Sequence, residues 1–141
     1  MRFLDANVFV YAYYKPKKQL TEKEQQMKNA AKNIISRISS GEEDVITTVV
    51  QISEAANILK HGVSTGQLTG IVRGLFMLEN VKITGVSAAA YFAAVELGED
   101  LQLEANDALA VDTMKLNGVR EIYSFDEHFD QVEGITRLTE P

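Results

Sequence analysis

Apolar residues recur along the chain in two patterns, one typical of helices and one typical of short buried strands. Between Met27 and Ile38 they return every three or four residues, which predicts one apolar face of a helix that ends at Gly41. Similar signals predict further helices at about 7–14, 48–60, 64–78, 87–98 and 104–116. Short β-rich runs predict strands at 2–4, 45–47, 81–83 and 121–124, with 135–138 as a fifth strand at the sheet edge.

The alternation of strands and helices predicts an α/β fold. Strands separated by helices form parallel sheets with right-handed crossovers. We therefore expect a three-layer α/β/α architecture, with a central, mostly parallel sheet of four to five strands, in a single domain over residues 1–141. In such sheets the functional crevice lies at the carboxyl ends of the strands.

Four acidic residues occupy positions that this fold would bring together. Asp5 closes the first strand, and Asp126 follows the fourth strand at the same sheet edge. Glu54 lies on the helix after the second strand, and Asp107 lies in the first turn of the helix before the fourth strand. Alone, Asp107 could simply complement a helix dipole, and Glu54 could be an exposed helix residue. Together, four carboxylates in one cleft need either protons or a cation.

Composition narrows the chemistry of such a site. The chain has no cysteine, which excludes a disulfide scaffold, a thiolate zinc site, an iron–sulfur cluster and a cysteine nucleophile. An oxygen-rich site of this kind favours Mg²⁺ or Mn²⁺. Two such ions about 4 Å apart can clamp the attacking and leaving oxygens of a phosphodiester.

The charge balance initially argues against nucleic acid as a partner. Lys and Arg number 14 against 20 Asp and Glu, for a net charge of −6. If two divalent ions neutralised the four acids, the balance would rise to −2, and RNA would remain a possible substrate. No apolar run approaches the roughly 20 residues of a membrane span. We therefore expect a soluble, cytoplasmic protein.

The four acidic segments resemble the motifs of the PIN domain (PilT N-terminus) family of metal-dependent ribonucleases. The matching stretches are Phe3-Leu4-Asp5-Ala6-Asn7-Val8, Ser53-Glu54 with the following helix, Asn106-Asp107-Ala108-Leu109-Ala110, and Ser124-Phe125-Asp126-Glu127-His128-Phe129. Their order and spacing fit the family over almost the whole chain. The compact length and the C-terminal Phe-Asp are similar to VapC-type toxins of toxin–antitoxin pairs.

The resemblance implies RNA hydrolysis by a metal-activated water, a homodimer and, for a toxin, an antitoxin partner. It implies that the catalytic and metal-binding acids are Asp5, Glu54, Asp107 and Asp126, with Mg²⁺ or Mn²⁺, either one ion or two. Asn7 and Ser124 would support them through hydrogen bonds. Asp130, four residues after Asp126, could share or replace the role of that residue.

A basic stretch follows the first predicted helix. Lys15, Lys17 and Lys18 come after a group of tyrosines, and aromatic rings beside lysines can stack bases and bind phosphates. Equally, the tyrosines could pack in the core while the lysines are solvated. His61 and His128 are more simply explained as a helix-end residue and a solvated loop residue than as ligands.

Two other functions remain open at this point. The chain could be a PIN-like RNA-binding or RNA-processing module outside a toxin–antitoxin pair, although the presence of all four acids counts against lost catalysis. A haloacid dehalogenase-like phosphatase is less compatible with the sequence, because that family expects a second Asp where Asn7 stands. A receiver domain would need an acceptor Asp after a middle strand, where Thr84 is found instead.

Overall fold

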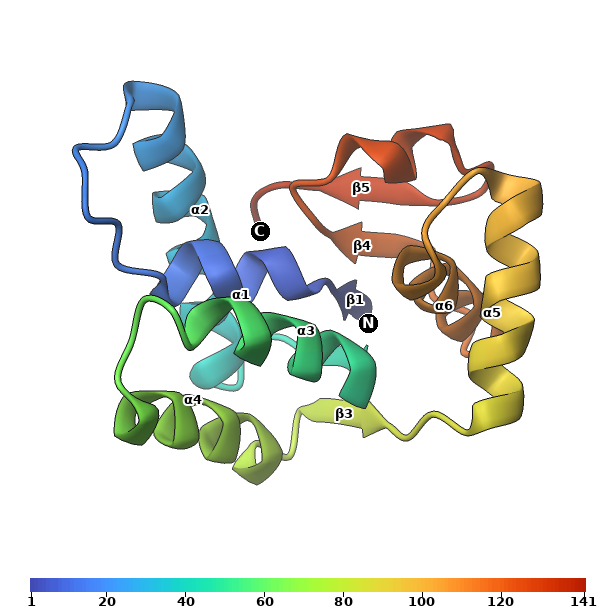
Figure 1. Ribbon diagram of the computed structural model, residues 1–141, viewed down its shortest axis with the longest axis horizontal. Helices are drawn as coiled ribbons and strands as arrows, with labels where there is room; N and C mark the ends of the chain where they lie inside the picture. Colours follow the sequence, from blue (N-terminus) through green and yellow to red (C-terminus); the bar gives the residue numbers. More distant parts are fainter.

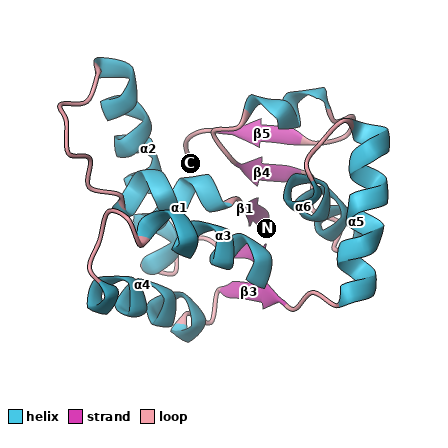
Figure 2. Cartoon of the chain, in the orientation of Figure 1, coloured by secondary structure: helices cyan, strands magenta, loops and turns pink.

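A five-stranded parallel sheet organises the molecule, and the computed structural model describes all of residues 1–141. The strands are β1 (Arg2–Leu4), β2 (Val45–Thr48), β3 (Val81–Thr84), β4 (Glu121–Tyr123) and β5 (Thr136–Leu138). They lie in the order β3-β2-β1-β4-β5, and every neighbouring pair is parallel. The predicted α/β fold and the fifth strand at the sheet edge are confirmed (Figures 1 and 2).

Six α-helices and one short 3-10 helix connect the strands. They are α1 (Ala6–Tyr13), α2 (Glu22–Ser39), α3 (Val49–Leu59), α4 (Thr65–Met77), α5 (Ala88–Leu101), α6 (Ala105–Leu116) and η1 (Glu127–Gln131). The helix α2 begins before Met27, because Thr21 and Glu24 form a reciprocal capping box ahead of the apolar stripe. The predicted end of α5 at Gly98 is wrong. This glycine allows close packing, since a Cβ there would lie 2.6 Å from the Leu103 carbonyl oxygen.

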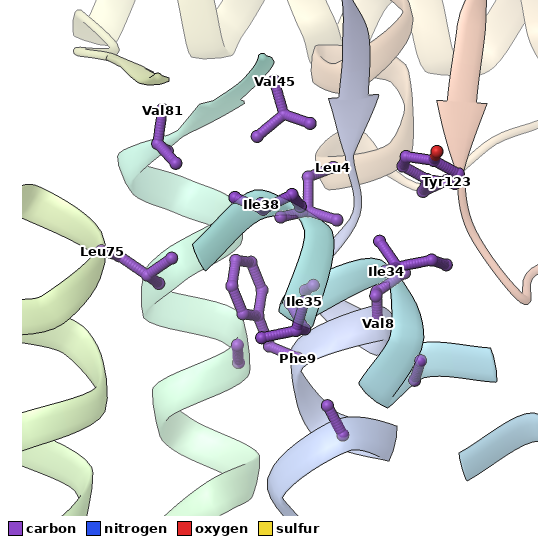
Figure 3. Close-up of a cluster of buried hydrophobic side chains, with 14 residues drawn as sticks. Leu4, Val8, Phe9, Ile34, Ile35, Ile38, Val45, Leu75, Val81 and Tyr123 are labelled. Atoms are coloured by element: carbon purple, nitrogen blue, oxygen red, sulfur yellow. The ribbon is translucent and has the colours of Figure 1, made fainter. Parts of the chain in front are cut away.

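Side chains of the central strands alternate between two hydrophobic layers. Leu4, Val45 and Tyr123 pack against α1, α2 and α4 on one face of the sheet (Figure 3). Their chain neighbours Phe3, Ile46 and Ile122 pack against α5 and α6 on the other face. Because strand side chains point to opposite faces in turn, both faces of the sheet are covered, which completes three layers.

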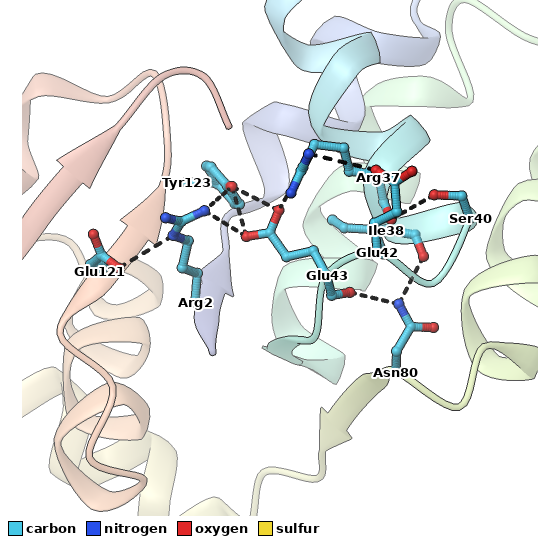
Figure 4. A network of polar contacts seen from close by, with 9 residues as sticks. All are labelled: Arg2, Arg37, Ile38, Ser40, Glu42, Glu43, Asn80, Glu121 and Tyr123. Carbon is cyan, nitrogen blue, oxygen red and sulfur yellow. Dashed lines mark hydrogen bonds and ion pairs between the residues drawn. The ribbon is translucent and has the colours of Figure 1, made fainter.

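A polar network closes the amino-terminal side of the sheet (Figure 4). The Glu43 carboxylate accepts a hydrogen bond from Arg2 Nη1 at 2.7 Å and from the Tyr123 hydroxyl at 2.7 Å. Asn80 donates to the carbonyl oxygens of Ile38 and Glu43 at 2.8 and 2.7 Å. These bonds connect β1, β4 and the turn before β2, on the side of the sheet away from the strand ends that carry Asp5 and Ser124. None of the helices has the length and apolar character that a membrane crossing needs.

Removal of the Glu43 carboxylate should destabilise the fold. Glu43→Ala leaves Arg2 and the Tyr123 hydroxyl without their shared acceptor, so we expect a loss of about 1–3 kcal/mol in the free energy of unfolding in urea. Glu42→Ala is the matched control, because this exposed neighbour pairs only with Arg37 at 3.5 Å. It should cost no more than about 0.5 kcal/mol. Equal losses for the two variants would contradict a structural role for the network.

Candidate active site

Asp5 lies at the carboxyl end of β1, where the chain turns into α1. Its backbone N–H donates to the Tyr123 carbonyl oxygen at 3.1 Å, which fixes it beside β4. Its side chain caps α1 by accepting from the Ala6 N–H at 2.8 Å and also accepts from the Ser124 hydroxyl at 2.6 Å. Only 4% of the residue is exposed. Burial raises the pKa of this carboxyl to about 6, although the two hydrogen bonds act in the opposite direction.

The Ser124 hydroxyl joins three parts of the site. It donates to Asp5, and it accepts from the Asp126 N–H at 3.0 Å and from Asn7 Nδ2 at 3.3 Å. Asn7 Oδ1 in turn accepts from the Phe125 N–H at 3.2 Å. The predicted supporting residues Asn7 and Ser124 therefore lie together with Asp5, and they connect the start of α1 to the loop after β4.

A buried glutamine connects the three helices that begin at the site. Gln51 on α3 is 0% exposed. Its Oε1 accepts from the Ala6 N–H at 3.0 Å, and its Nε2 donates to the Asn106 carbonyl oxygen at 3.2 Å. The spacing of Thr48 and Gln51 predicts a capping box, and Thr48 does accept from the Gln51 N–H at 3.2 Å. The glutamine side chain does not return to the cap. It bridges α1 and α6 instead.

Glu54 and Asp107 face this same region from α3 and α6. Burial raises the pKa of Glu54, the hydrogen bond with Asn106 lowers it, and the charges of Glu104 and Asp126 raise it further. Asp107 lies in the first turn of α6. Burial raises the pKa of Asp107 to about 7, and the charges of Asp5, Asp126, Glu54 and Glu104 add to the shift. The other three predicted acids are therefore close enough to Asp107 for their charges to raise its pKa.

Asp126 caps η1 and has a histidine beside it. Its Oδ1 accepts from the His128 N–H at 2.9 Å and lies 3.0 Å from His128 Nδ1. Ligand atoms of Asp107, Asp126 and His128 all lie within 4.8 Å of one another, so this group of three could hold a metal ion. The His128 side chain is 74% exposed. It is a loop residue, as expected, but it lies at the acids.

Asp130 is engaged elsewhere. Its two carboxylate oxygens accept from Arg137 Nε and Nη2, each at 2.9 Å, and this pairing lowers its pKa. Arg137 Nη1 also donates to the Ser124 carbonyl oxygen at 3.2 Å. Asp126 therefore lies with Asp107 and His128, whereas Asp130 pairs with an arginine that also binds the loop after β4.

The structure places Lys15 and Lys18 of the three candidate lysines in different pockets. All three follow α1, whose eight residues place its far end about 12 Å from Asp5. Lys15 lines a pocket between α2 and α4. Lys18 lines a different pocket that includes His61, and Lys17 is exposed. The grouping that the sequence indicates is therefore not a single surface.

Comparison with known proteins places these residues in a family. The sequence profile of the PIN domain matches residues 2–135. The chain belongs to the PIN domain family. A comparison with curated protein sequences finds no match.

The PIN fold seen here is shared with solved toxin structures. VapC20 from Mycobacterium tuberculosis, described as a sarcin-ricin loop cleaving toxin, has a TM-score of 0.67 at 16% identity over 92% of this chain and 93% of that one. A toxin–antitoxin complex from Klebsiella pneumoniae has a TM-score of 0.63 at 14% identity over 96% of both chains. VapBC2 from Rickettsia felis, bound to a promoter DNA fragment, has a TM-score of 0.62 at 15% identity over 97% and 96%. These identities establish a common fold.

The sequence alone assigns no role at the site to several polar residues of this PIN domain. Gln51 and Asn106 carry the contacts between α3 and α6, and the Tyr91 hydroxyl donates to Asn106 Oδ1. Arg137 comes from β5, far along the chain from Ser124. A glutamine three residues before Glu54 on a largely apolar helix was the one available signal.

The raised pKa values predict how stability depends on pH in the metal-free PIN domain. Asp5 and Asp107 have pKa values of about 6 and 7 in the folded chain, against 3.8 ordinarily. Between about pH 4 and 7 the folded state therefore binds more protons than the unfolded state, so the free energy of unfolding falls as pH rises. Thermal unfolding in EDTA should show a melting temperature that drops between about pH 5 and 8.

Asp107→Asn should reduce that drop and raise the melting temperature at the alkaline end. Asp112→Asn, one and a half turns further along α6, is the control for loss of a carboxylate elsewhere on the helix. A melting temperature that stays constant or rises over this range would show that the pKa values of Asp5 and Asp107 are not raised in the folded chain.

Proposed function

We propose that the protein is a metal-dependent endoribonuclease that hydrolyses RNA phosphodiester bonds, and that it is the toxin of a VapBC-type pair. One observation carries the proposal. Asp5 at the end of β1, Glu54 on α3 and Asp126 in the loop after β4 lie close enough to Asp107 on α6 for their charges all to raise its pKa. Repulsion of this kind is relieved when a cation binds.

The donor set fits a hard divalent cation. It consists of the carboxylates of Asp5, Glu54, Asp107 and Asp126, with the His128 imidazole in reach of two of them. Oxygen ligands favour Mg²⁺ or Mn²⁺, and one imidazole is compatible with Mn²⁺. When bound, such a cation supplies positive charge to the phosphate and makes a nearby water more acidic.

The chain's own residues hold this donor set in place. Ser124 and the Ala6 N–H each engage one oxygen of Asp5, which fixes the plane of its carboxylate. Asp126 is oriented by the N–H of His128 and by its own N–H on Ser124. Because these hydrogen bonds exist before ligands bind, the site needs little reorganisation to receive a phosphodiester.

The proposed partners follow from the same family membership. An antitoxin would cover the cleft and block cleavage. The cytoplasm, where RNA is available, would be the place of action. A short reading frame next to this gene, encoding a protein that binds the chain and stops cleavage, is the observation that tests the toxin assignment. Its absence would favour an RNA-processing enzyme outside such a pair.

We also propose a homodimer. Phe92 and Val95 are exposed one turn apart on α5, with the side chains of Phe76 and Met77 exposed on α4. Phe92 and Val95 share one face of α5, and exposed apolar side chains on one helix face are typical of association surfaces. A monomer mass in sedimentation equilibrium at micromolar concentration would contradict this proposal.

A phosphatase of the haloacid dehalogenase type receives no support from the geometry. In that family a second carboxylate would stand at position 7. Here Asn7 uses its amide oxygen to accept the Phe125 N–H and its amide nitrogen to donate to Ser124. A carboxylate could not make the second of these bonds, so Asn7 is suited to a supporting role.

Substitution of single acids tests the proposed site. Asp5→Asn, Asp107→Asn and Asp126→Asn should each lower Mg²⁺- or Mn²⁺-dependent cleavage of a fluorescent RNA by at least about 100-fold, because each removes a charged ligand. Asp130→Asn should retain most activity, since Asp130 pairs with Arg137. Asp112→Asn is the control for folding. Full activity of the Asp126 variant with a loss in the Asp130 variant would reverse the assignment of the fourth acid.

A further inference from the structure

A pocket next to the recess beside Glu54 is not used by the proposed chemistry. This pocket, of about 420 Å³, lies where the end of α1, the loop after it, the start of α2 and the end of α3 meet. We call it the α1–α3 pocket and define it by Tyr11, Tyr14, Lys18, Lys28, Ile58 and His61. Its size is within the range of pockets that bury small ligands.

The helices α1 and α3 connect the region of the acids to the α1–α3 pocket. On α1, Tyr11 follows Asn7 by one turn, and its ring meets that of Phe125 edge-on at 5.1 Å between centroids. On α3, Ile58 follows Glu54 by one turn and lines both the pocket and the recess beside Glu54. One turn advances about 5.4 Å, so a chain lying across the acids would reach the pocket within one or two nucleotides.

The aromatic part of the pocket is held rigidly. The Tyr14 ring lies so close over Gly62 that a Cβ there would be 2.7 Å from it. The Tyr11 ring rests against Phe125. Rings fixed in this way can stack a base without losing much side-chain freedom, and every base presents a face for such stacking.

The charged part of the pocket is basic. Lys18, Lys28 and His61 line it, against one acid, Glu24, whose carboxylate accepts from the Thr21 N–H in the cap of α2. Lys28 Nζ donates to the carbonyl oxygens of Tyr11 and Tyr14 at 3.1 and 2.7 Å, which fixes its charge at the end of α1. In a chain of net charge −6, this local excess of basic groups is where a phosphate would be attracted.

We infer that the α1–α3 pocket binds one nucleotide of a single-stranded RNA substrate, next to the phosphodiester that lies over the acids. The base would stack on the tyrosines, and a flanking phosphate would contact Lys18 and His61. This inference rests on the proposed ribonuclease function and adds to it a place for the substrate. Of the three lysines that the sequence groups together, it assigns only Lys18 to that place.

RNA affinity in the absence of cleavage tests the pocket. Fluorescence anisotropy of a fluorescein-labelled single-stranded RNA of about 10 nucleotides would be measured in the Asp107→Asn background, so that the RNA stays intact. The double substitution Lys18→Gln with His61→Gln should weaken binding by about 10-fold. It should also make binding less dependent on salt: the slope of log K against log salt concentration should become shallower by about 0.7 for each lost phosphate contact. Tyr14→Leu should weaken it through lost stacking.

Lys32→Gln is the matched control, because it removes one charge from α2 one turn beyond Lys28 and outside the pocket. It should change the affinity by less than about 2-fold. In the wild-type background, the pocket variants should raise KM and leave kcat nearly unchanged, because the contact is remote from the reacting atoms. Circular dichroism and melting temperatures confirm that each variant is folded.

The outcomes for the pocket and for the proposed function are separable. No metal-dependent cleavage by the wild-type protein would overturn the ribonuclease proposal. Cleavage by the wild type, combined with pocket variants that bind RNA like the Lys32 control, would overturn the inference alone. That second result is also the one expected if the pocket receives a protein partner instead of RNA.

Discussion

The main constraint on this structure is the placement of several acidic side chains together in a partly buried region. Asp5, Glu54, Asp107 and Asp126 lie near one another, and burial is the largest cause of the raised pKa values of Asp5 and Asp107, which are about 6 and 7. A group of acids in this state is unfavourable at neutral pH, and the rest of the structure has to hold it together. Carboxylates placed together in this way are stabilised when a cation binds near them.

A small set of buried polar contacts holds the segments that carry the acidic residues in fixed relative positions. Gln51 bridges the starts of α1 and α6, and the Ser124 hydroxyl connects Asp5 to the Asp126 N–H. On the far side of Ser124, Arg137 binds its carbonyl oxygen. Each of these groups is satisfied by another segment of the chain, so the loss of any one leaves a buried polar atom without a partner. The amino-terminal network around Glu43 fixes β1 to β4 from the opposite side.

Much of the fold could be predicted from the sequence because hydrophobic periodicity depends on neighbours along the chain. The alternation of strands and helices identified the parallel sheet, and the rule that sites lie at strand ends brought Asp5 and Asp126 together. Details of the site that depend on contacts between residues far apart in sequence could not be predicted. Asp126 and Asp130 are four residues apart and carry the same side chain, and they are distinguished by contacts from distant segments, such as the pairing of Asp130 with Arg137 of β5.

Gln51 shows the same limit from another direction. Its spacing from Thr48 predicts a local helix cap, and its backbone N–H does donate to the Thr48 hydroxyl. Its side chain, however, forms hydrogen bonds with the backbone of Ala6 and Asn106, which are 45 and 55 residues away in sequence. The lysines after α1 are close together in the sequence, which suggests one basic group, but Lys15 and Lys18 line separate pockets in the fold. Side-chain direction in a loop is set by what it packs against, and that information is not local.

Calorimetric titration of the metal-free protein with Mn²⁺ tests the central claim most directly, when it is repeated in two buffers that differ in ionisation enthalpy. With pKa values of about 6 for Asp5 and about 7 for Asp107, the cleft retains protons near neutrality that a bound cation must displace. The account predicts saturable binding with release of about one proton at about pH 6.5, falling to nearly zero by about pH 8.5. Saturable binding without proton release at the lower pH, or no binding at all, would contradict it.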